Sequence, residues 1–248
     1  MEHSLDSCLL CKSSNLNQVI DLNSTPLGDS FRATLLAAKK QNVYTLALKV
    51  CMECHQIQLS HIVNPDEVYD EEYLYTTDVS VGLPEHFKSS ATNIINEFKL
   101  TEKDMVLEIG SNQGVMLKAF QDKGIKVLGV EPASIASSRA MKDGVETIND
   151  FFNLSIADEI NKKYKNIKII IANNVIANIP NLHEIVKAIK RIVNKKNGVF
   201  IFETSYILDV LSNKLIDTIY HEHISYLCVS SLHQFFTNYG LVLFDVEK

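Results

Sequence analysis

The feature of the sequence that most constrains its fold is a regular alternation of short apolar strands and amphipathic helices, which starts near residue 84. Because consecutive parallel strands need a crossover connection, this alternation predicts an α/β fold with a doubly wound, mostly parallel sheet. The expected helices are 84–98, 115–123, 133–142, 154–164, 181–194 and 230–239. The expected strands are 105–109, 126–130, 168–172, 198–203 and 241–246, with a weaker one just before residue 149.

The residues that follow the first two strands predict a nucleoside site, because ligands of such sheets bind at the carboxyl ends of the strands. A glycine-rich turn follows the first strand, and an acid about 20 residues later can accept hydrogen bonds from ribose hydroxyls. The glycines read G-x-x-x-G, which fits a pyrophosphate poorly and favours a nucleoside without phosphate, such as S-adenosylmethionine (SAM). The alternative is a structural glycine turn. The candidate residues are Glu108, Gly110, Ser111, Asn112, Gly114, Glu131 and Pro132.

Four of the five cysteines form two C-x2-C pairs, Cys8 with Cys11 and Cys51 with Cys54. Two such turns can supply the four thiolates of a tetrahedral zinc site, and four cysteine ligands leave no open position, so we expect a structural ion. The alternative is four buried or disulfide-bonded cysteines. Cys228 stands alone and is interpreted as a core residue.

The charge and the apolar runs limit the partners of the chain. A net charge of -6 argues against a nucleic-acid partner. The first residues have no basic segment followed by an apolar one, as a signal peptide would, and no apolar run approaches the roughly 18 residues of a membrane helix. We therefore expect a cytoplasmic protein that has no membrane contact.

The stretch TIYHEHISYL, residues 218–227, places His221, Glu222 and His223 side by side, with Tyr220 just before them. Histidine is the usual general base near neutral pH, so this cluster predicts proton-transfer chemistry. A His-x-His metal pair is the competing interpretation, for which the spacing suggests no third ligand.

VLEIGSNQG and GVEPA resemble the first two cofactor motifs of class I SAM-dependent methyltransferases. With the two cysteine pairs ahead of them and TIYHEHISYL behind, nearly the whole chain resembles the sugar C-methyltransferases, which methylate C3 of nucleotide-linked 4-keto-deoxyhexoses. The resemblance implies a zinc-binding domain at 1–68, a connecting segment at 69–83 and a Rossmann-like SAM-binding domain at 84–248. It also implies a C-terminal domain that this chain lacks.

The resemblance assigns roles in carbon methylation, in which an enolate attacks the methyl group of the sulfonium. His223 would remove the proton next to the ketone, and Tyr220 would lie beside the reacting sugar. Glu222 would orient neighbours or hold a sugar hydroxyl, and His221 is the member that could be structural.

The resemblance also implies further site residues. A tyrosine of the connecting segment reaches the active site in the family, and Tyr75 matches it better than Tyr73; an aromatic contact between domains is the alternative. Asp150 and Phe151 would flank the adenine. Asn173 and Asn174 would border the methionine part of the cofactor.

The chain departs from the family in two ways. Asn178 stands where a histidine is expected, and an asparagine can donate hydrogen bonds but cannot serve as an acid or base. Relatives also continue beyond residue 248, which would leave an open sheet edge. A dimer or a C-terminal partner that covers this edge is a hypothesis.

Two other functions stay open. The chain could be a catalytically incomplete SAM-binding and zinc module that needs a separate C-terminal partner. It could also be an O- or N-methyltransferase, against which the Tyr-His-Glu-His run argues, because such a base is most useful for carbon acids.

Overall fold

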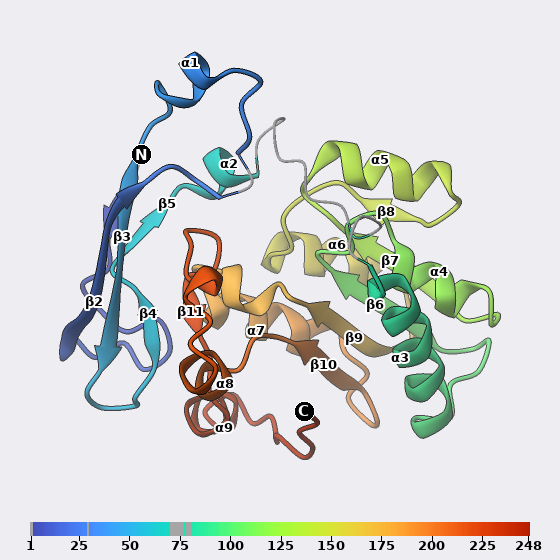
Figure 1. The fold of residues 1–248 in the computed structure, drawn as a ribbon. Helices are drawn as coiled ribbons and strands as arrows, with labels where there is room; N and C mark the ends of the chain where they lie inside the picture. The colour runs from blue at the N-terminus through green and yellow to red at the C-terminus, as the bar shows by residue number, and fades with distance from the viewer. Residues whose placement is uncertain (1, 29, 70–76, 78–80) are drawn as a thin grey trace. The chain divides into compact units, whose positions relative to one another are not determined.

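The computed structural model describes residues 2–28, 30–69, 77 and 81–248. The chain divides into two compact units, and each unit combines segments that are far apart in the sequence (Figure 1). Unit 1 comprises Met1–Glu72, Ile176–Val186 and Thr204–Lys248, and unit 2 comprises Tyr73–Val175 and Lys187–Glu203. The predicted domains are consecutive stretches of the sequence, whereas the segments of the two units alternate along the chain.

Unit 2 contains a five-stranded sheet in which every strand pair is parallel. The strand order is β10-β9-β6-β7-β8, and β6 is buried along its whole length. The predicted parallel α/β sheet is therefore confirmed. The strands are β6 (Met105–Ile109), β7 (Lys126–Val130), β8 (Thr147–Ile148), β9 (Ile167–Asn173) and β10 (Val199–Glu203).

The helices that alternate with these strands also match the predicted pattern. They are α3 (Leu83–Glu97), α4 (Val115–Gln121), α5 (Ser134–Lys142), α6 (Leu154–Lys163) and α7 (Leu182–Ile192), the last of which begins in unit 1. The helices α3 and α4 lie side by side in Figure 1. Phe87 of α3 and Phe120 of α4 pack into one core cluster with Val106 of β6, so both helices are held against the sheet.

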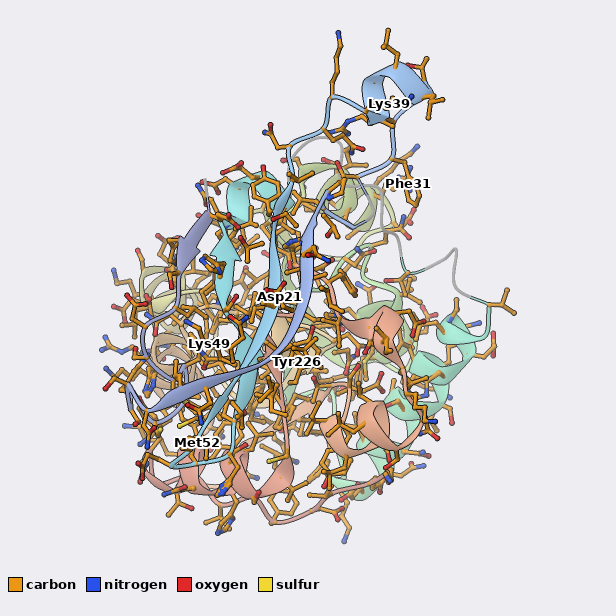
Figure 2. All side chains as sticks on the ribbon, turned by 60° about the vertical axis from the view of Figure 1, so that its left-hand side comes forward. Asp21, Phe31, Lys39, Lys49, Met52 and Tyr226 are labelled. Atoms are coloured by element: carbon orange, nitrogen blue, oxygen red, sulfur yellow. The ribbon has the colours of Figure 1, made fainter. Side chains whose placement is uncertain are left out.

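Unit 1 contains an antiparallel sheet with the order β11-β4-β3-β2 and a separate pair of β1 with β5. Figure 2 shows Phe31 and Lys39 at one end of the β2–β3 ribbon and Met52 at the other. The strands are β1 (Glu2–Ser4), β2 (Leu16–Thr25), β3 (Tyr44–Cys51), β4 (Ile57–Leu59), β5 (His61–Val63) and β11 (Ser225–Tyr226). The helices are α1 (Leu35–Ala38), α2 (Pro65–Val68), α8 (Ile207–Ser212) and α9 (Val229–Thr237), with 3-10 turns η2 (Ile176–Asn178) and η3 (Ile216–Thr218).

The strand β11 follows the Tyr-His-Glu-His run directly and pairs antiparallel with β4 of the cysteine-bearing region. Ser225 lies opposite Gln58, and the N–H of Leu59 donates a 2.9 Å hydrogen bond to the carbonyl oxygen of Ile224. Ile224, Tyr226 and Leu59 are buried in one core cluster. The backbone of the histidine-bearing segment is thus fixed by the N-terminal sheet.

The predicted strand at 241–246 is wrong, because the structure has no regular element in 241–248. Val242, Phe244 and Val246 are exposed, by 77%, 63% and 57%. Alternating apolar residues favour a strand only when a neighbouring strand accepts their backbone hydrogen bonds, and within the described chain this segment has no such neighbour.

No helix among the residues that the structure describes combines the length and the apolar character that crossing a bilayer requires.

Candidate functional site

The turn after β6 adopts a backbone that constrains its residue types. Gly110 and Gly114 have φ values of +67° and +73°, and Asn112 between them has +47°. A Cβ atom on Gly110 would lie 2.4 Å from Cγ2 of Val175, so glycine is needed there for space as well as for conformation. The main chain therefore approaches the segment after β9 closely at the carboxyl edge of the sheet.

Glu131, which follows β7, is joined to this turn. Its Oε2 accepts a 2.8 Å hydrogen bond from the N–H of Asn112, and its Oε1 accepts one of 2.8 Å from the N–H of Ala133. Burial raises the pKa of Glu131, while the two N–H donors favour the charged form. Each carboxylate oxygen has more than one acceptor direction, so these bonds still allow Glu131 to accept a hydroxyl.

Glu108 is the most enclosed acid of this edge, with 3% of its surface exposed. Its Oε1 accepts a hydrogen bond of 3.3 Å from Nδ2 of Asn173, whose Nδ2 also lies 2.8 Å from the sulfur of Met116. Burial raises the pKa of Glu108 to about 8, and the charge of Glu131 adds to the increase.

The other predicted cofactor residues also belong to unit 2. Ser111 is buried and its hydroxyl has no hydrogen-bond partner among the described residues. The carbonyl oxygen of Pro132 accepts a 2.9 Å bond from Asn149. Asp150 accepts a 2.7 Å bond from the N–H of Phe151, whose ring is partly exposed.

Asn174 belongs to a network that the sequence did not predict. Its Nδ2 donates to Oε1 of Glu203 over 3.1 Å, and Oε2 of Glu203 lies 2.6 Å from Nε2 of His86. Thr77 is a second unpredicted neighbour, since its hydroxyl donates to Asn112 over 3.2 Å. The pair of Asn174 and Glu203 could have been predicted, because both residues lie at the carboxyl ends of neighbouring strands, β9 and β10. No sequence pattern around His86 or Thr77 predicts their contacts.

In unit 1, Tyr220 and His223 form a hydrogen-bonded pair. Nδ1 of His223 lies 3.0 Å from the carbonyl oxygen of Thr218, which can only accept, so Nδ1 carries the proton of the neutral ring. Nε2 then accepts, and the hydroxyl of Tyr220 donates to it over 3.0 Å. This arrangement leaves Nε2 of His223 unprotonated, which is the form of the ring that a general base requires.

Glu222 lies beside two further donors. Its Oε1 accepts a 3.2 Å hydrogen bond from the hydroxyl of Tyr69 and one of 3.1 Å from Nδ2 of Asn178. Burial raises the pKa of Tyr69 well above its ordinary value, and the charge of Glu222 adds to the increase. The predicted residue Asn178 is therefore in contact with the Tyr-His-Glu-His run. Tyr69 was not predicted, although it begins the tyrosine-rich connecting segment.

His221 faces the interior of unit 1. It is 3% exposed, and its Nε2 lies 3.2 Å from the carbonyl oxygen of Tyr44 on β3. Burial lowers the pKa of His221, which keeps the ring neutral. These contacts favour a structural part for His221.

The placement of Tyr75, and of the alternative Tyr73, lies outside the described residues. Gly28 is a further residue that the sequence did not single out: a Cβ atom there would lie 3.1 Å from Cδ2 of Tyr220. Gly28 therefore packs closely against the ring of Tyr220 and helps to hold that ring in place. The sequence around Gly28 contains no pattern that predicts this contact.

The four paired cysteines converge in unit 1. Their sulfur atoms all lie within 4.8 Å of one another, and Cys8 to Cys54 and Cys11 to Cys51 are both 3.5 Å apart. A zinc ion with four sulfurs at about 2.3 Å places them roughly 3.8 Å apart, whereas a disulfide needs about 2.05 Å. The cluster therefore fits zinc, and the disulfide alternative does not fit.

The two C-x2-C turns have the same local geometry. The carbonyl oxygens of Cys8 and Cys51 each accept a 3.0 Å hydrogen bond from the fourth residue on, Lys12 and His55. Both of those residues have positive φ, +63° and +61°. The two turns therefore share one backbone conformation, in which the two thiols of a pair point to the same side. Two pairs that are distant in the sequence can in this way form one cluster of four sulfur atoms.

The family comparisons match both parts of the chain. Residues 85–246 match a family model described as "Methyltransferase domain", and residues 8–69 match one described as "Putative zinc binding domain". The second match contains all four clustered cysteines.

One curated relative is the C-methyltransferase NovU of Streptomyces niveus, which is 30% identical over 243 residues. The match covers 98% of this chain and 57% of that protein, so the chain spans little more than half the length of this relative.

Solved structures share the fold. The plantazolicin methyltransferase BpumL in complex with SAH matches with a TM-score of 0.51 and 17% identity, over 63% of this chain and 64% of that chain. A chain of the complex between the Haloferax volcanii Trm112 methyltransferase activator and a methyltransferase matches with a TM-score of 0.52 and 17% identity, over 66% and 73%. The family match over 85–246 shows that the chain belongs to the methyltransferase domain family.

Proposed function

We propose that this chain acts as a SAM-dependent C-methyltransferase on a carbon next to the ketone of a nucleotide-linked keto-deoxysugar. The observation that carries the proposal is the Tyr220–His223 pair, because a neutral imidazole whose unprotonated nitrogen lies beside a phenol provides both a base and a hydrogen-bond donor for removal of a carbon-bound proton. The C-methyltransferase relative supports the choice of a carbon acceptor.

The carboxyl edge of unit 2 fits SAM, which supplies an electrophilic methyl group when it is bound. Glu131 would accept the ribose hydroxyls, since it follows β7 and is held by the Asn112 and Ala133 N–H groups. The close approach at Gly110 leaves backbone rather than side chain next to a ligand. Asn173 and Asn174 would border the methionine part, and Asp150 and Phe151 would flank the adenine.

His223 would take the proton at Nε2. Once both ring nitrogens carry protons, Nδ1 still donates to the carbonyl oxygen of Thr218, which stabilises the charged ring. The hydroxyl of Tyr220 would donate to the oxygen that becomes negative as the enolate forms. Asn178, a donor at the same cluster, would contribute hydrogen bonds but no proton transfer.

The four-cysteine cluster would hold a structural zinc ion, because four thiolates leave no position open for substrate. A reducing, cytoplasmic location would keep these thiols available. The strand β10 lies at one end of the unit 2 sheet, which supports a dimer or a C-terminal partner at that edge. Size-exclusion chromatography that shows a clean monomer would count against the dimer.

Exchange of substrate protons with solvent tests the base. The chain would be incubated in D2O with S-adenosylhomocysteine and a panel of nucleotide-linked 4-keto-deoxyhexoses, and the carbons next to the ketone followed by NMR. We expect deuterium exchange at one such carbon and loss of that exchange in His223→Ala. When SAM replaces S-adenosylhomocysteine, the same carbon should be methylated. Methyl transfer to oxygen or nitrogen without exchange would contradict the proposal.

A further inference from the structure

Gln58 is a wholly buried polar residue in the strand β4, with 0% of its surface exposed. Its side-chain amide forms two hydrogen bonds with one short stretch of backbone. Oε1 accepts a 2.8 Å bond from the N–H of Leu9, and Nε2 donates to the carbonyl oxygen of Ser7 over 3.1 Å. These two backbone groups flank Cys8, the first residue of the cysteine cluster. Gln58 therefore holds the backbone on both sides of Cys8.

The backbone of the same strand contacts the histidine-bearing segment. The strand β4 lies between β3 and β11, and Gln58 lies opposite Ser225 of β11. The next residue, Leu59, donates its N–H to the carbonyl oxygen of Ile224 over 2.9 Å. Ile224 follows His223 directly in the sequence. Gln58 is thus joined through its side chain to the cysteine cluster and through its strand to the segment that carries the proposed base.

The two bonds of this side chain make the cysteine turn and the strand β4 depend on each other. A buried amide group is stable when its oxygen and its nitrogen both have partners, because water cannot replace them there. If the turn that contains Cys8 moved, Gln58 would lose both of these partners at once. A zinc ion that joins Cys8 to the other three cysteines would keep this turn, and with it the partners of Gln58, in place.

Gln56 provides a comparison within the same chain. It is also 0% exposed and lies two residues before Gln58. Its Nε2 donates to the carbonyl oxygen of Ile57 over 2.8 Å, and its Oε1 accepts a 3.2 Å bond from the hydroxyl of Ser231 in α9. Neither of these two bonds reaches a cysteine turn. The N–H of Cys51 donates to the backbone carbonyl oxygen of Gln56, which a change of the side chain leaves in place.

We propose that Gln58 is a positioning residue, through which zinc binding at the cysteine cluster holds the backbone of Tyr220–Tyr226 in place. This inference rests on the proposed function, in which His223 of that segment is the base. Zinc binding would then influence proton transfer as well as stability. Coupling of this kind is reciprocal, so the ordered segment should raise the affinity of the cluster for zinc by the same factor.

The same substitution at the two glutamines tests the proposal. Gln58→Met and Gln56→Met each replace a buried amide by an apolar side chain of similar length. Both variants and the wild type are loaded with zinc, and amide hydrogen exchange is followed by NMR without substrate. The N–H of Leu59, which bonds to Ile224, reports on the contact between β4 and the histidine segment. The N–H of Leu107 in β6 of unit 2 serves as the reference for global unfolding.

Only the variant at Gln58 should uncouple the two sites. In zinc-loaded Gln58→Met, exchange at Leu59 should become faster while exchange at Leu107 stays unchanged. Its zinc affinity, measured by competition with a chelator, should fall about 5–150-fold, the range typical of coupling between two sites. Gln56→Met should match the wild type in both measurements. Removal of zinc from the wild type should reproduce the faster exchange at Leu59.

A kinetic measurement distinguishes positioning from a general loss of structure. In Gln58→Met, kcat for methyl transfer should fall because His223 is held less firmly. The dissociation constant for SAM should stay the same, because the predicted cofactor residues belong to unit 2. The NMR signal of the Nδ1 proton of His223, which bonds to Thr218, should weaken in parallel with kcat.

The outcomes separate this inference from the proposed function. Equal effects of the two variants on Leu59, or unchanged exchange at Leu59 in folded Gln58→Met, would overturn the inference and leave the proposed function standing. Faster exchange at Leu59 in a chain that transfers no methyl group would support the coupling and overturn the proposed function. If Gln58→Met does not fold, Gln58→Glu replaces it. That variant keeps the acceptor for Leu9 and, when ionised, loses the donor to Ser7, so it should show a smaller effect in the same direction.

Discussion

The hydroxyl of Tyr220 lies 3.0 Å from Nε2 of His223, and the two rings are 4.2 Å apart. If this pair performs the proton transfer, His223→Ala should lower turnover by about 10²–10⁴-fold, the contribution typical of a general base. SAM affinity, measured by calorimetry, should stay nearly unchanged. A strong loss of SAM binding in His223→Ala would mean that the residue supports the cofactor site or the fold.

Removal of the Tyr220 hydroxyl tests the other half of the pair, with Tyr226 as the matched control. Tyr226 is buried, and its hydroxyl has no hydrogen-bond partner among the described residues. Tyr220→Phe should therefore lower kcat, whereas Tyr226→Phe should leave kcat near wild type, because the hydrogen bond to His223 comes from Tyr220. Equal losses in the two variants would indicate a packing effect instead.

The bond from Tyr69 to Glu222 gives a third prediction. Tyr69→Phe should destabilise the fold by about 1 kcal/mol, the usual net value of one hydrogen bond. Tyr44→Phe is a suitable control, because Tyr44 donates a 2.9 Å hydrogen bond to a different acid, Glu67. Urea unfolding should show similar losses for both, while only Tyr69→Phe lowers kcat. If both variants retain full kcat, Tyr69 has no part in orienting Glu222.

A comparison of two glycines in unit 2 distinguishes the cost of a left-handed backbone from the cost of a steric clash. Gly110 and Gly124 both have positive φ, +67° and +81°, but a Cβ atom meets Val175 at 2.4 Å only at Gly110 and nothing within 4 Å at Gly124. Gly124→Ala should cost about 1–2 kcal/mol of unfolding free energy from its left-handed backbone. Gly110→Ala should cost about 1–3 kcal/mol more from overpacking and should weaken SAM binding. Equal unfolding free energies would contradict the crowding at Gly110.

Metal analysis tests the cysteine cluster. We expect one zinc per chain, and loss of that zinc in Cys51→Ser, while Cys228→Ser retains it because Cys228 lies outside the cluster. Removal of the ion should destabilise unit 1 by several kcal/mol, a part of the roughly 10–16 kcal/mol that zinc binding contributes in isolated peptides. Full zinc content in Cys51→Ser would disprove the assignment of Cys51 as a ligand.

The burial of Glu108 also predicts a pH dependence of stability in the free protein. The pKa is about 8 when folded against about 4.5 when the group is free, so the folded state binds more protons between these values. The free energy of unfolding should therefore fall by up to about 1.4 kcal/mol per unit as the pH rises through this window. Urea unfolding of wild type and Glu108→Gln at pH 5, 6.5 and 8 checks this. The free energy of unfolding of the wild type should fall relative to that of the variant as the pH rises, and a difference that stays constant over this range would contradict the raised pKa of Glu108.

The sequence was informative wherever structure depends on neighbours along the chain. The buried strands and amphipathic helices of 84–203 have clear periods, and the two C-x2-C turns repeat one local geometry, so both could be predicted. The strand at 241–246 was wrong because its pattern says nothing about whether a partner strand exists. Domain boundaries drawn in chain order remain a prediction, and they could not anticipate that 204–248 belongs to the same compact unit as the cysteine region.

The candidate site could be predicted only where its residues are neighbours along the chain. The Tyr-His-Glu-His run is local, so its members could be named, but the donors to Glu222 come from Tyr69 and Asn178, which lie far from it in the sequence. Asn178 was named only through a family resemblance, and Tyr69 was missed. The distinct surroundings of His221 and His223 depend on β3 and on the Thr218 carbonyl, which no pattern in HEH specifies.

The pairing of β11 with β4 has a consequence for the order in which the protein matures. Two short strands from opposite halves of the chain must meet before the histidine segment is fixed, and such distant contacts form late because the intervening loop must first be closed. The cysteine turns and β3 need only the first sixty residues, so they can assemble while the rest is still being synthesised. A nascent chain that lacks zinc would therefore lack the strands on which the Tyr220–His223 segment is later positioned.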